Sequence, residues 1–130
     1  MALRAYWEQD NTEGITNRIE IDVDGFSGTA IELSANDVGF RFKHDEVSGA
    51  DAEGIINPYR NRIQRGVLDF FPFIRDTDEQ TFIDDIIGNP PEDVLLTWKQ
   101  DGSIYWQGYV FTEKVSYPES IGYIATVRAS

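Results

Sequence analysis

The sequence predicts a mainly β protein, an antiparallel β-barrel or sandwich with one short α-helix. Apolar and polar side chains alternate in several strand-length segments, which is the period of a half-buried strand. Turn residues separate these segments, and the repeated helical crossovers of a parallel sheet are missing. The chain has 130 residues, of which 41% are hydrophobic and 26% charged, as in one ordinary globular domain. We therefore expect residues 1–130 to form a single β domain.

The first third of the chain contains four of the predicted strands. Residues 18–24 are the clearest, because Ile19, Ile21 and Val23 fall on every second position and acidic residues take the other face. The glycines of residues 24–28 predict a turn that joins this strand to the next in a hairpin. The other strands predicted here are residues 3–8, 29–34 and 38–43.

The middle of the chain predicts an exposed loop, a strand and a helix. Residues 45–57 are small and polar, which favours a loop, and residues 67–74 are apolar enough for a buried strand. Proline cannot donate to a ladder, so Pro72 predicts an edge or a bulge near the end of that strand. A helix is expected over residues 78–87.

Both ends of this helix carry a signal. Thr77 can cap it with Gln80 as its capping-box partner, while Gly88 and the following prolines end it. Its apolar side chains repeat on one side, so we expect the helix to lie on the sheet, and ten residues are too few to be stable without that contact. These side chains are Phe82, Ile83, Ile86 and Ile87.

Residues 94–111 predict the clearest hairpin. Asp101-Gly102 fits a two-residue type I′ turn, which would place Trp98 opposite Tyr105, and Thr97 opposite Trp106. Gly108 interrupts the second strand, which indicates a bulge, a bend or a close backbone. A last strand is predicted over residues 122–128.

The charge and composition exclude several classes of function. The chain has 23 acidic and 11 basic residues and a net charge of -12, which opposes wrapping of nucleic acid and sequence-specific binding to it. No apolar run approaches the roughly 18 residues of a membrane helix, and no signal-peptide stretch opens the chain, so no membrane partner is expected. The chain has no cysteine, which removes disulfides and thiolate chemistry.

Motifs for catalysis and cofactor binding are weak. His44 is the one histidine, at a predicted strand end beside acidic residues, where a solvated side chain is commoner than a catalytic one. The acidic clusters that begin at Asp22 and Asp76 lack the glycine and glutamate of a calcium loop, and there is no glycine-rich phosphate loop. We expect that the protein is not an enzyme and that it has no catalytic residue, no metal site and no cofactor. A hydrolase with paired carboxylates remains the least favoured alternative.

The candidate binding residues are arginines and aromatics. Arg60, Arg62 and Arg65 concentrate positive charge in an acidic chain, and Tyr59 precedes them. Guanidinium groups pair with carboxylates and tyrosine is enriched at interfaces, so this segment is predicted to dock on the acidic face of a neighbouring subunit or partner; a solvated linker is the alternative. Trp106 and Tyr109 are the further predicted interface residues.

A second interpretation uses the aromatic side chains differently. Exposed tryptophan and tyrosine rings can stack on sugars, so the alternative function is a carbohydrate- or host-surface-binding β module without catalysis. The candidate stacking residues are Trp7, Trp98, Tyr105, Trp106 and Tyr109.

The sequence has a distinctive order of aromatic, glycine and acidic motifs, at residues 6–7, 18–21, 24–28, 82–86, 104–110, 117–118 and 123–130. The order and spacing of these motifs resemble tail hub or tail-tip (baseplate) structural proteins of bacteriophages and prophages. The resemblance implies a β-barrel-like module that packs with other tail proteins, in a homo-oligomeric ring around a channel for DNA. It implies assembly in the bacterial cytoplasm, a final location in the virion tail, and no catalytic residue. It also leads us to expect either the N-terminal module of a longer protein or a minimal member.

Overall fold

The computed structural model describes residues 1–44, 66–112 and 122–130, which form strands, an α-helix and a 3₁₀ turn. The mainly β fold class is confirmed. In chain order the elements are β1 Ala2–Asp10, β2 Thr16–Val23, β3 Ile31–Glu32, β4 Ser34–His44, β5 Gly66–Ile74, α2 Thr77–Ile87, η2 Pro91–Asp93, β6 Val94–Gln100, β7 Ser103–Tyr109, β8 Tyr123–Ile124 and β9 Val127–Ala129.

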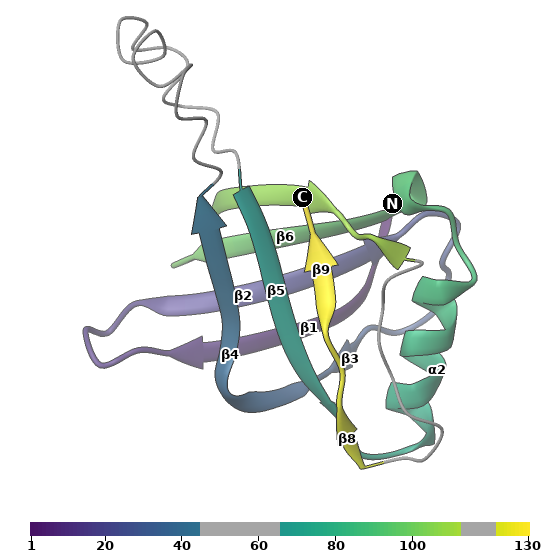
Figure 1. Ribbon diagram of the computed structural model, residues 1–130, viewed down its shortest axis with the longest axis horizontal. Helices are drawn as coiled ribbons and strands as arrows, with labels where there is room; N and C mark the ends of the chain where they lie inside the picture. Colours follow the sequence, from purple (N-terminus) through teal and green to yellow (C-terminus); the bar gives the residue numbers. More distant parts are fainter. Residues whose placement is uncertain (45–65, 113–121) are drawn as a thin grey trace, which may run out of the picture.

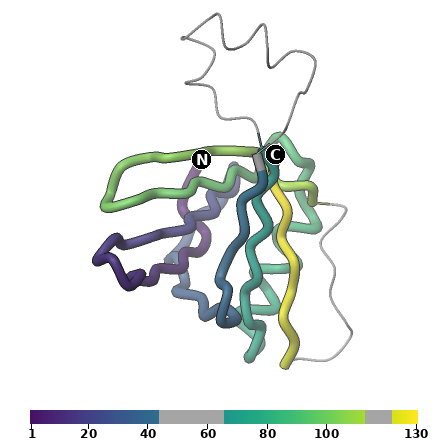
Figure 2. Tube along the Cα trace, turned by 60° about the vertical axis from the view of Figure 1, so that its left-hand side comes forward, coloured from purple at the N-terminus to yellow at the C-terminus, as the bar shows by residue number. Residues whose placement is uncertain are grey.

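The strands form two sheets that pack face to face. Sheet A has the order β3-β1-β2-β6-β7, and sheet B has the order β4-β5-β8, with β9 also paired to β5. The strands of sheet B run across those of sheet A (Figure 1), and the hairpins of sheet A project beyond them (Figure 2). The sheets meet at one corner, where Val110 pairs with Ala129. Over the described ranges they form a sandwich and do not close into a barrel.

Aromatic rings fill the space where the two sheets cross. Trp7 of β1 lies 5.9 Å from Phe40 and 5.8 Å from Phe70 between ring centroids. Phe42 of β4 lies 5.5 Å from Trp98 and 5.4 Å from Trp106. The alternation predicted for residues 18–24 is confirmed, since Ile19, Ile21 and Val23 are buried in this core. Burial of these apolar surfaces is the main favourable contribution to the fold.

Helix α2 covers one side of the sandwich (Figure 1). Its buried face contains Phe82, Ile83 and Ile86, whereas Ile87 is exposed. The predicted cap at Thr77 is wrong by one residue: the Asp76 side chain accepts from the Glu79 N–H at 2.9 Å. The cap and its acidic partner are still three residues apart, as in a capping box. Gly88 ends the helix as predicted.

The hairpin of β6 and β7 confirms the predicted turn but not the predicted register. Asp101 and Gly102 both have positive φ, 49° and 85°, as a type I′ turn requires. An irregularity beside Trp98 leaves Tyr105 without a direct partner, so Trp98 lies opposite Trp106 and Thr97 opposite Gln107. One extra residue in β7 is a β-bulge.

Gly108 marks a close backbone approach, as one reading of the sequence predicted. A Cβ at this position would lie 2.9 Å from the carbonyl carbon of Ser130. The neighbouring Tyr109 N–H donates to the Ser130 carbonyl at 3.0 Å. The bulge of β7 lies at Tyr105 instead.

The hairpin predicted between residues 18–24 and 29–34 is wrong. Strand β2 already has β1 and β6 as its two neighbours, so no edge of β2 is left. The chain instead crosses to the far side of β1, where Ile31 and Glu32 pair with it in parallel. The predicted strand is therefore reduced to these two residues.

Pro72 affects the ladder as expected, although β5 is central in sheet B. The Pro72 carbonyl accepts from the Ala125 N–H at 2.9 Å, but proline has no N–H to return. The last strand is interrupted here between β8 and β9. On the other side of β5, the pairing with β4 shifts between Ala35 and Phe40, so the ladder is irregular beside Pro72. The predicted loop over residues 45–57 lies outside the described residues.

Candidate interaction surfaces

The structure tests few of the predicted interface residues directly. Tyr59, Arg60, Arg62 and Arg65 lie outside the described residues. Trp106 is only 4% exposed and packs in the core, so it offers almost no surface to a partner. Tyr109 is 49% exposed on β7, the edge strand of sheet A.

The aromatic residues considered for sugar stacking separate into two groups. Trp7, Trp98 and Trp106 are buried between the sheets, which removes them from any ligand surface. Tyr105 and Tyr109 are about half exposed, together with Ile104 on the same strand. Of the five candidate stacking residues, Tyr105 and Tyr109 therefore remain accessible to a sugar.

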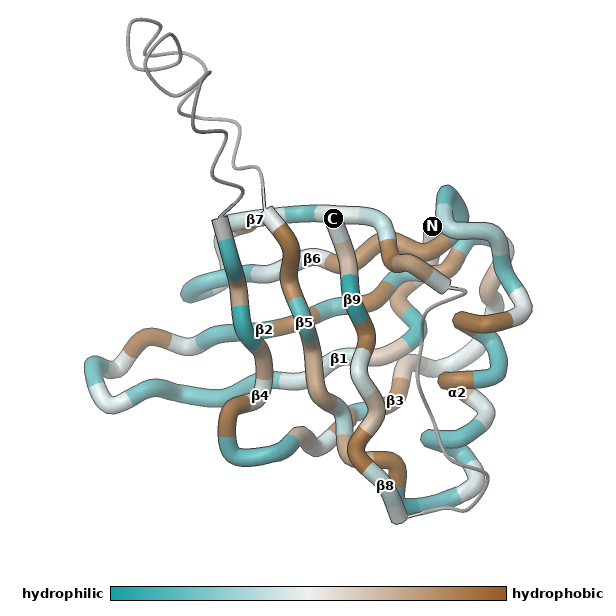
Figure 3. Tube along the Cα trace, viewed as in Figure 1, coloured by the Kyte–Doolittle hydropathy of each residue, from teal (hydrophilic) through white to brown (hydrophobic). Residues whose placement is uncertain are grey.

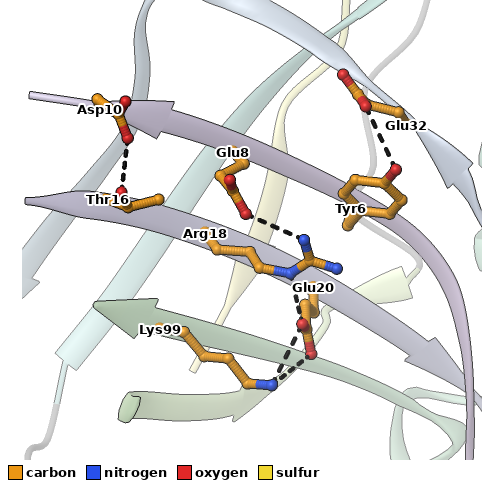
Figure 4. Close-up of polar contacts among 8 residues, drawn as sticks. All are labelled: Tyr6, Glu8, Asp10, Thr16, Arg18, Glu20, Glu32 and Lys99. Carbon is orange, nitrogen blue, oxygen red and sulfur yellow. Dashed lines mark hydrogen bonds and ion pairs between the residues drawn. The ribbon is translucent and has the colours of Figure 1, made fainter. Parts of the chain in front are cut away.

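The outer face of sheet A, turned away from sheet B, carries a network of charged side chains (Figure 4). Arg18 of β2 lies at its centre: Nε donates to Glu20 at 2.6 Å and Nη1 donates to Glu8 at 3.1 Å. The guanidinium also stacks 4.3 Å from the centroid of the Tyr6 ring. Lys99 of β6 adds a second cation, 3.1 Å from Glu20.

Carboxylates outnumber cations on this face, and we name it the acidic face. Tyr6 donates to Glu32 at 3.3 Å, and Thr16 donates to Asp10 at 2.6 Å. Because β2 alternates, Asp22 projects on the same side as Glu20. The acidic face consists of Glu8, Asp10, Glu20, Asp22 and Glu32, with the cations Arg18 and Lys99.

Two of these carboxylates have perturbed pKa values of opposite sign. Burial opposes ionisation of Glu20, but the hydrogen bonds from Arg18 and Lys99 outweigh it and hold its pKa below the ordinary value. Burial, reinforced by the negative charge of Glu20, raises the pKa of Asp22. The surroundings of Asp22 thus disfavour its ionised form.

An apolar row borders the acidic face. Leu3 pairs with Asp22, Asp22 with Leu95, and Leu95 with Tyr109 across four neighbouring strands. Cross-strand partners project on the same side of a sheet. A partner on this face would therefore meet apolar side chains beside the carboxylates.

The outer face of sheet B has the opposite charge. Arg41 of β4, Asp69 of β5 and Arg128 of β9 form one row across the sheet. The Arg128 guanidinium donates to both Asp69 oxygens, at 2.7 and 3.1 Å, while Arg41 lies 3.6 Å away. The bidentate hydrogen bonds from Arg128 hold the pKa of Asp69 below its ordinary value, although burial opposes this.

Apolar side chains flank this row of charges. Phe71 and Phe73 follow Asp69 on the outer side of β5, and Arg41 stacks 5.8 Å from the Phe71 centroid. Phe73 pairs with Ile124, which is half exposed. Figure 3 shows β5 as largely apolar, with hydrophilic segments on β4 and β9 beside it. We name this surface the basic–aromatic face: Arg41, Lys43, Asp69, Phe71, Phe73, Ile124 and Arg128.

Sequence reasoning missed the basic–aromatic face. Residues 67–74 were interpreted only as a buried strand, although their odd positions contain Asp69, Phe71 and Phe73. That alternation was an available signal for a second, outward face. The arginines beside Asp69 could not be assigned, because Arg128 is 59 residues away in sequence.

Comparison with known proteins finds no matching family model, no similar curated protein and no similar solved structure. Among the described residues, no three or more histidine, aspartate or glutamate side chains come together as a metal site would require. In the same part of the chain, no helix has the length and apolar composition needed to cross a bilayer.

Proposed function

We propose that this chain is a structural protein of a bacteriophage tail, which packs against other subunits at the tail tube, hub or tip. It acts without catalysis, and its partners are other tail proteins and further copies of itself in a ring. Its place is in the virion tail after assembly in the bacterial cytoplasm. The order of motifs that resembles tail hub and tail-tip proteins supports this proposal.

The observation that carries the proposal is the basic–aromatic face. Phe71, Phe73 and Ile124 project from the side of sheet B opposite the core, beside Arg41 and Arg128. Aromatic residues and arginine are enriched at the centres of protein interfaces. A sheet face that combines them is suited to packing on another folded protein.

The acidic composition fits a position next to DNA that must slide. A net charge of -12 repels phosphates, so a ring of such subunits would let a duplex pass without binding it. This role needs no base-specific contact and no cleft.

Electron microscopy of phage particles tests the proposal. Antibodies raised against the chain should label the tail, at the tube end or tip, of particles released by the bacterium that encodes it. Mass spectrometry of purified particles should find the chain in a fixed ratio to other tail proteins. Its absence from particles, with retention on a glycan array through Tyr105 or Tyr109, would replace the proposal by the carbohydrate-binding alternative.

A further inference from the structure

We infer that the basic–aromatic face of one copy docks on the acidic face of a second copy of the same chain. This inference rests on the proposed function, because it names the partner and the two surfaces of the packing contact. It differs from the docking predicted for Arg60, Arg62 and Arg65, since it uses side chains of sheet B.

Charge complementarity identifies the partner. Among its described residues, the basic–aromatic face has three cations, Arg41, Lys43 and Arg128, against the one carboxylate of Asp69. The acidic face has five carboxylates against two cations, Arg18 and Lys99. The chain has a net charge of -12, so two copies repel each other over most of their surface. A face with an excess of cations is repelled less by a second copy than an acidic face is. Opposite potentials steer association and fix the pairing of surfaces.

Several charged side chains on each face are accessible. Arg41 has a side chain that is 69% exposed, and Lys43 is also exposed. On the other face, the Glu8 side chain is 49% exposed, and Asp10 and Glu32 are exposed. A second copy could therefore reach them without unfolding any strand.

Both faces also have apolar side chains beside their charges, which could pack against each other in the contact. Phe71, Phe73 and Ile124 lie beside the cations of sheet B, and Leu3, Leu95 and Tyr109 lie beside the carboxylates of sheet A. Charge pairs at the surface contribute little by themselves. Burial of the apolar side chains would supply most of the affinity, and the charges would determine which faces meet.

The position of the faces determines the kind of assembly. Each face is the outer side of a different sheet of one sandwich. Contact between two different faces is heterologous, so each added copy leaves one face of each kind free. Repetition of the contact gives a closed ring or an open filament.

Charge reversal on each face tests the inference by sedimentation velocity and light scattering of the purified chain. The basic-face variant carries R41E and K43E, and the acidic-face variant carries E8K and D10K. The wild-type chain should self-associate, and each variant alone should lose that association. A mixture of the two variants should recover complexes that contain both, because the intact acidic face of one meets the intact basic–aromatic face of the other.

The matched control reverses two exposed carboxylates that lie on neither face, in D78K/E92K. It changes the net charge as much as the acidic-face variant and should keep the wild-type association. Circular dichroism checks that each variant is folded. If a variant fails to fold, the salt dependence of the wild-type association replaces it: raised ionic strength should weaken the association, because exposed charges are screened over about 8 Å at physiological salt.

Three results would overturn the inference: a monomeric wild-type chain, association that survives both reversals, or a mixture that stays dissociated. The proposed function has a separate readout. If tail particles contain the chain while one of these results is found, the chain packs with other tail proteins and the contact between copies is wrong. If the contact between copies is found but particles lack the chain, the proposed function fails alone.

Discussion

Arg4 is a buried cation that connects sheet A to helix α2. Its Nε donates to Asp85 at 2.7 Å, and its guanidinium lies 4.9 Å from the Phe26 centroid and 5.8 Å from the Phe82 centroid. Planar stacking between two rings suits arginine better than lysine. The side chain therefore fixes the helix on the sheet by charge and by packing together.

We predict that Arg4→Ala lowers the free energy of unfolding by about 2–3 kcal/mol, through loss of the charged hydrogen bond and the cation–π contacts. Arg4→Met retains apolar packing between Phe26 and Phe82, so its effect should be smaller. Urea unfolding followed by circular dichroism measures both. A change below about 0.5 kcal/mol for Arg4→Ala, as at an ordinary surface position, would contradict the role given to this side chain.

The pKa shifts of two aspartates predict opposite pH dependences. The pKa of Asp69 is lowered in the fold, so its contribution to stability is present above the ordinary pKa and is lost as the pH falls through the folded value. Asp69→Asn should destabilise the chain at neutral pH, and the difference from wild type should shrink in acid.

Asp22 gives the control with the reverse sign. Its pKa is raised in the fold, so the charged form is disfavoured by folding and its stability contribution is lost as the pH rises through the folded value. Asp22→Asn should therefore stabilise the chain at neutral pH and have no effect below the ordinary pKa of aspartate. Urea unfolding of both variants at a series of acidic pH values measures the two trends. Equal pH profiles for the two variants would contradict the contacts described for these carboxylates.

Individual elements show where sequence patterns are sufficient. The type I′ turn at Asp101-Gly102 was predictable because its backbone conformation depends on those two residues. The register beyond it was not, because the bulge at Tyr105 places that ring 4.5 Å from Trp98, a contact chosen by packing. The pairing of β3 could not be predicted either, because its partner β1 is distant in sequence.

The candidate surfaces follow the same rule. The acidic side of residues 18–24 could be read from their alternation, and the network around Arg18 is largely local to the β1–β2 hairpin. The row Arg41, Asp69 and Arg128 depends on pairings among β4, β5 and β9. Local patterns contain no information about such pairings.

Helix α2 gives a prediction at the scale of one element. Asp76 accepts from the Glu79 N–H at 2.9 Å, and Glu79 accepts from the Arg75 N–H at 2.7 Å. Asp76→Ala should lower the free energy of unfolding by about 1 kcal/mol, while Thr77→Ala should have a much smaller effect. Thermal or urea unfolding of both variants compares the two positions, and a larger loss for Thr77→Ala would return the cap to the residue that the sequence predicted.

The whole molecule depends on how closely the two sheets approach each other. Gly39 of β4 has φ of +76°, and a Cβ there would lie 2.5 Å from the ring of Trp7 on sheet A. That ring cannot move away easily, because Phe40 and Phe70 also contact it. The absence of a side chain at residue 39 therefore sets the separation of the sheets at this point.

Gly39→Ala should lower the free energy of unfolding by about 2–5 kcal/mol, the sum of overpacking and left-handed backbone strain. Gly14→Ala is the matched control, since Gly14 has φ of +82° but a Cβ there would meet nothing within 4 Å. Its loss should be limited to the backbone strain of about 1–2 kcal/mol. The difference between the two variants in urea unfolding isolates the contact between sheets A and B. Equal losses would mean that Trp7 and Gly39 are not packed together, and that the crossing of the sheets is differently arranged.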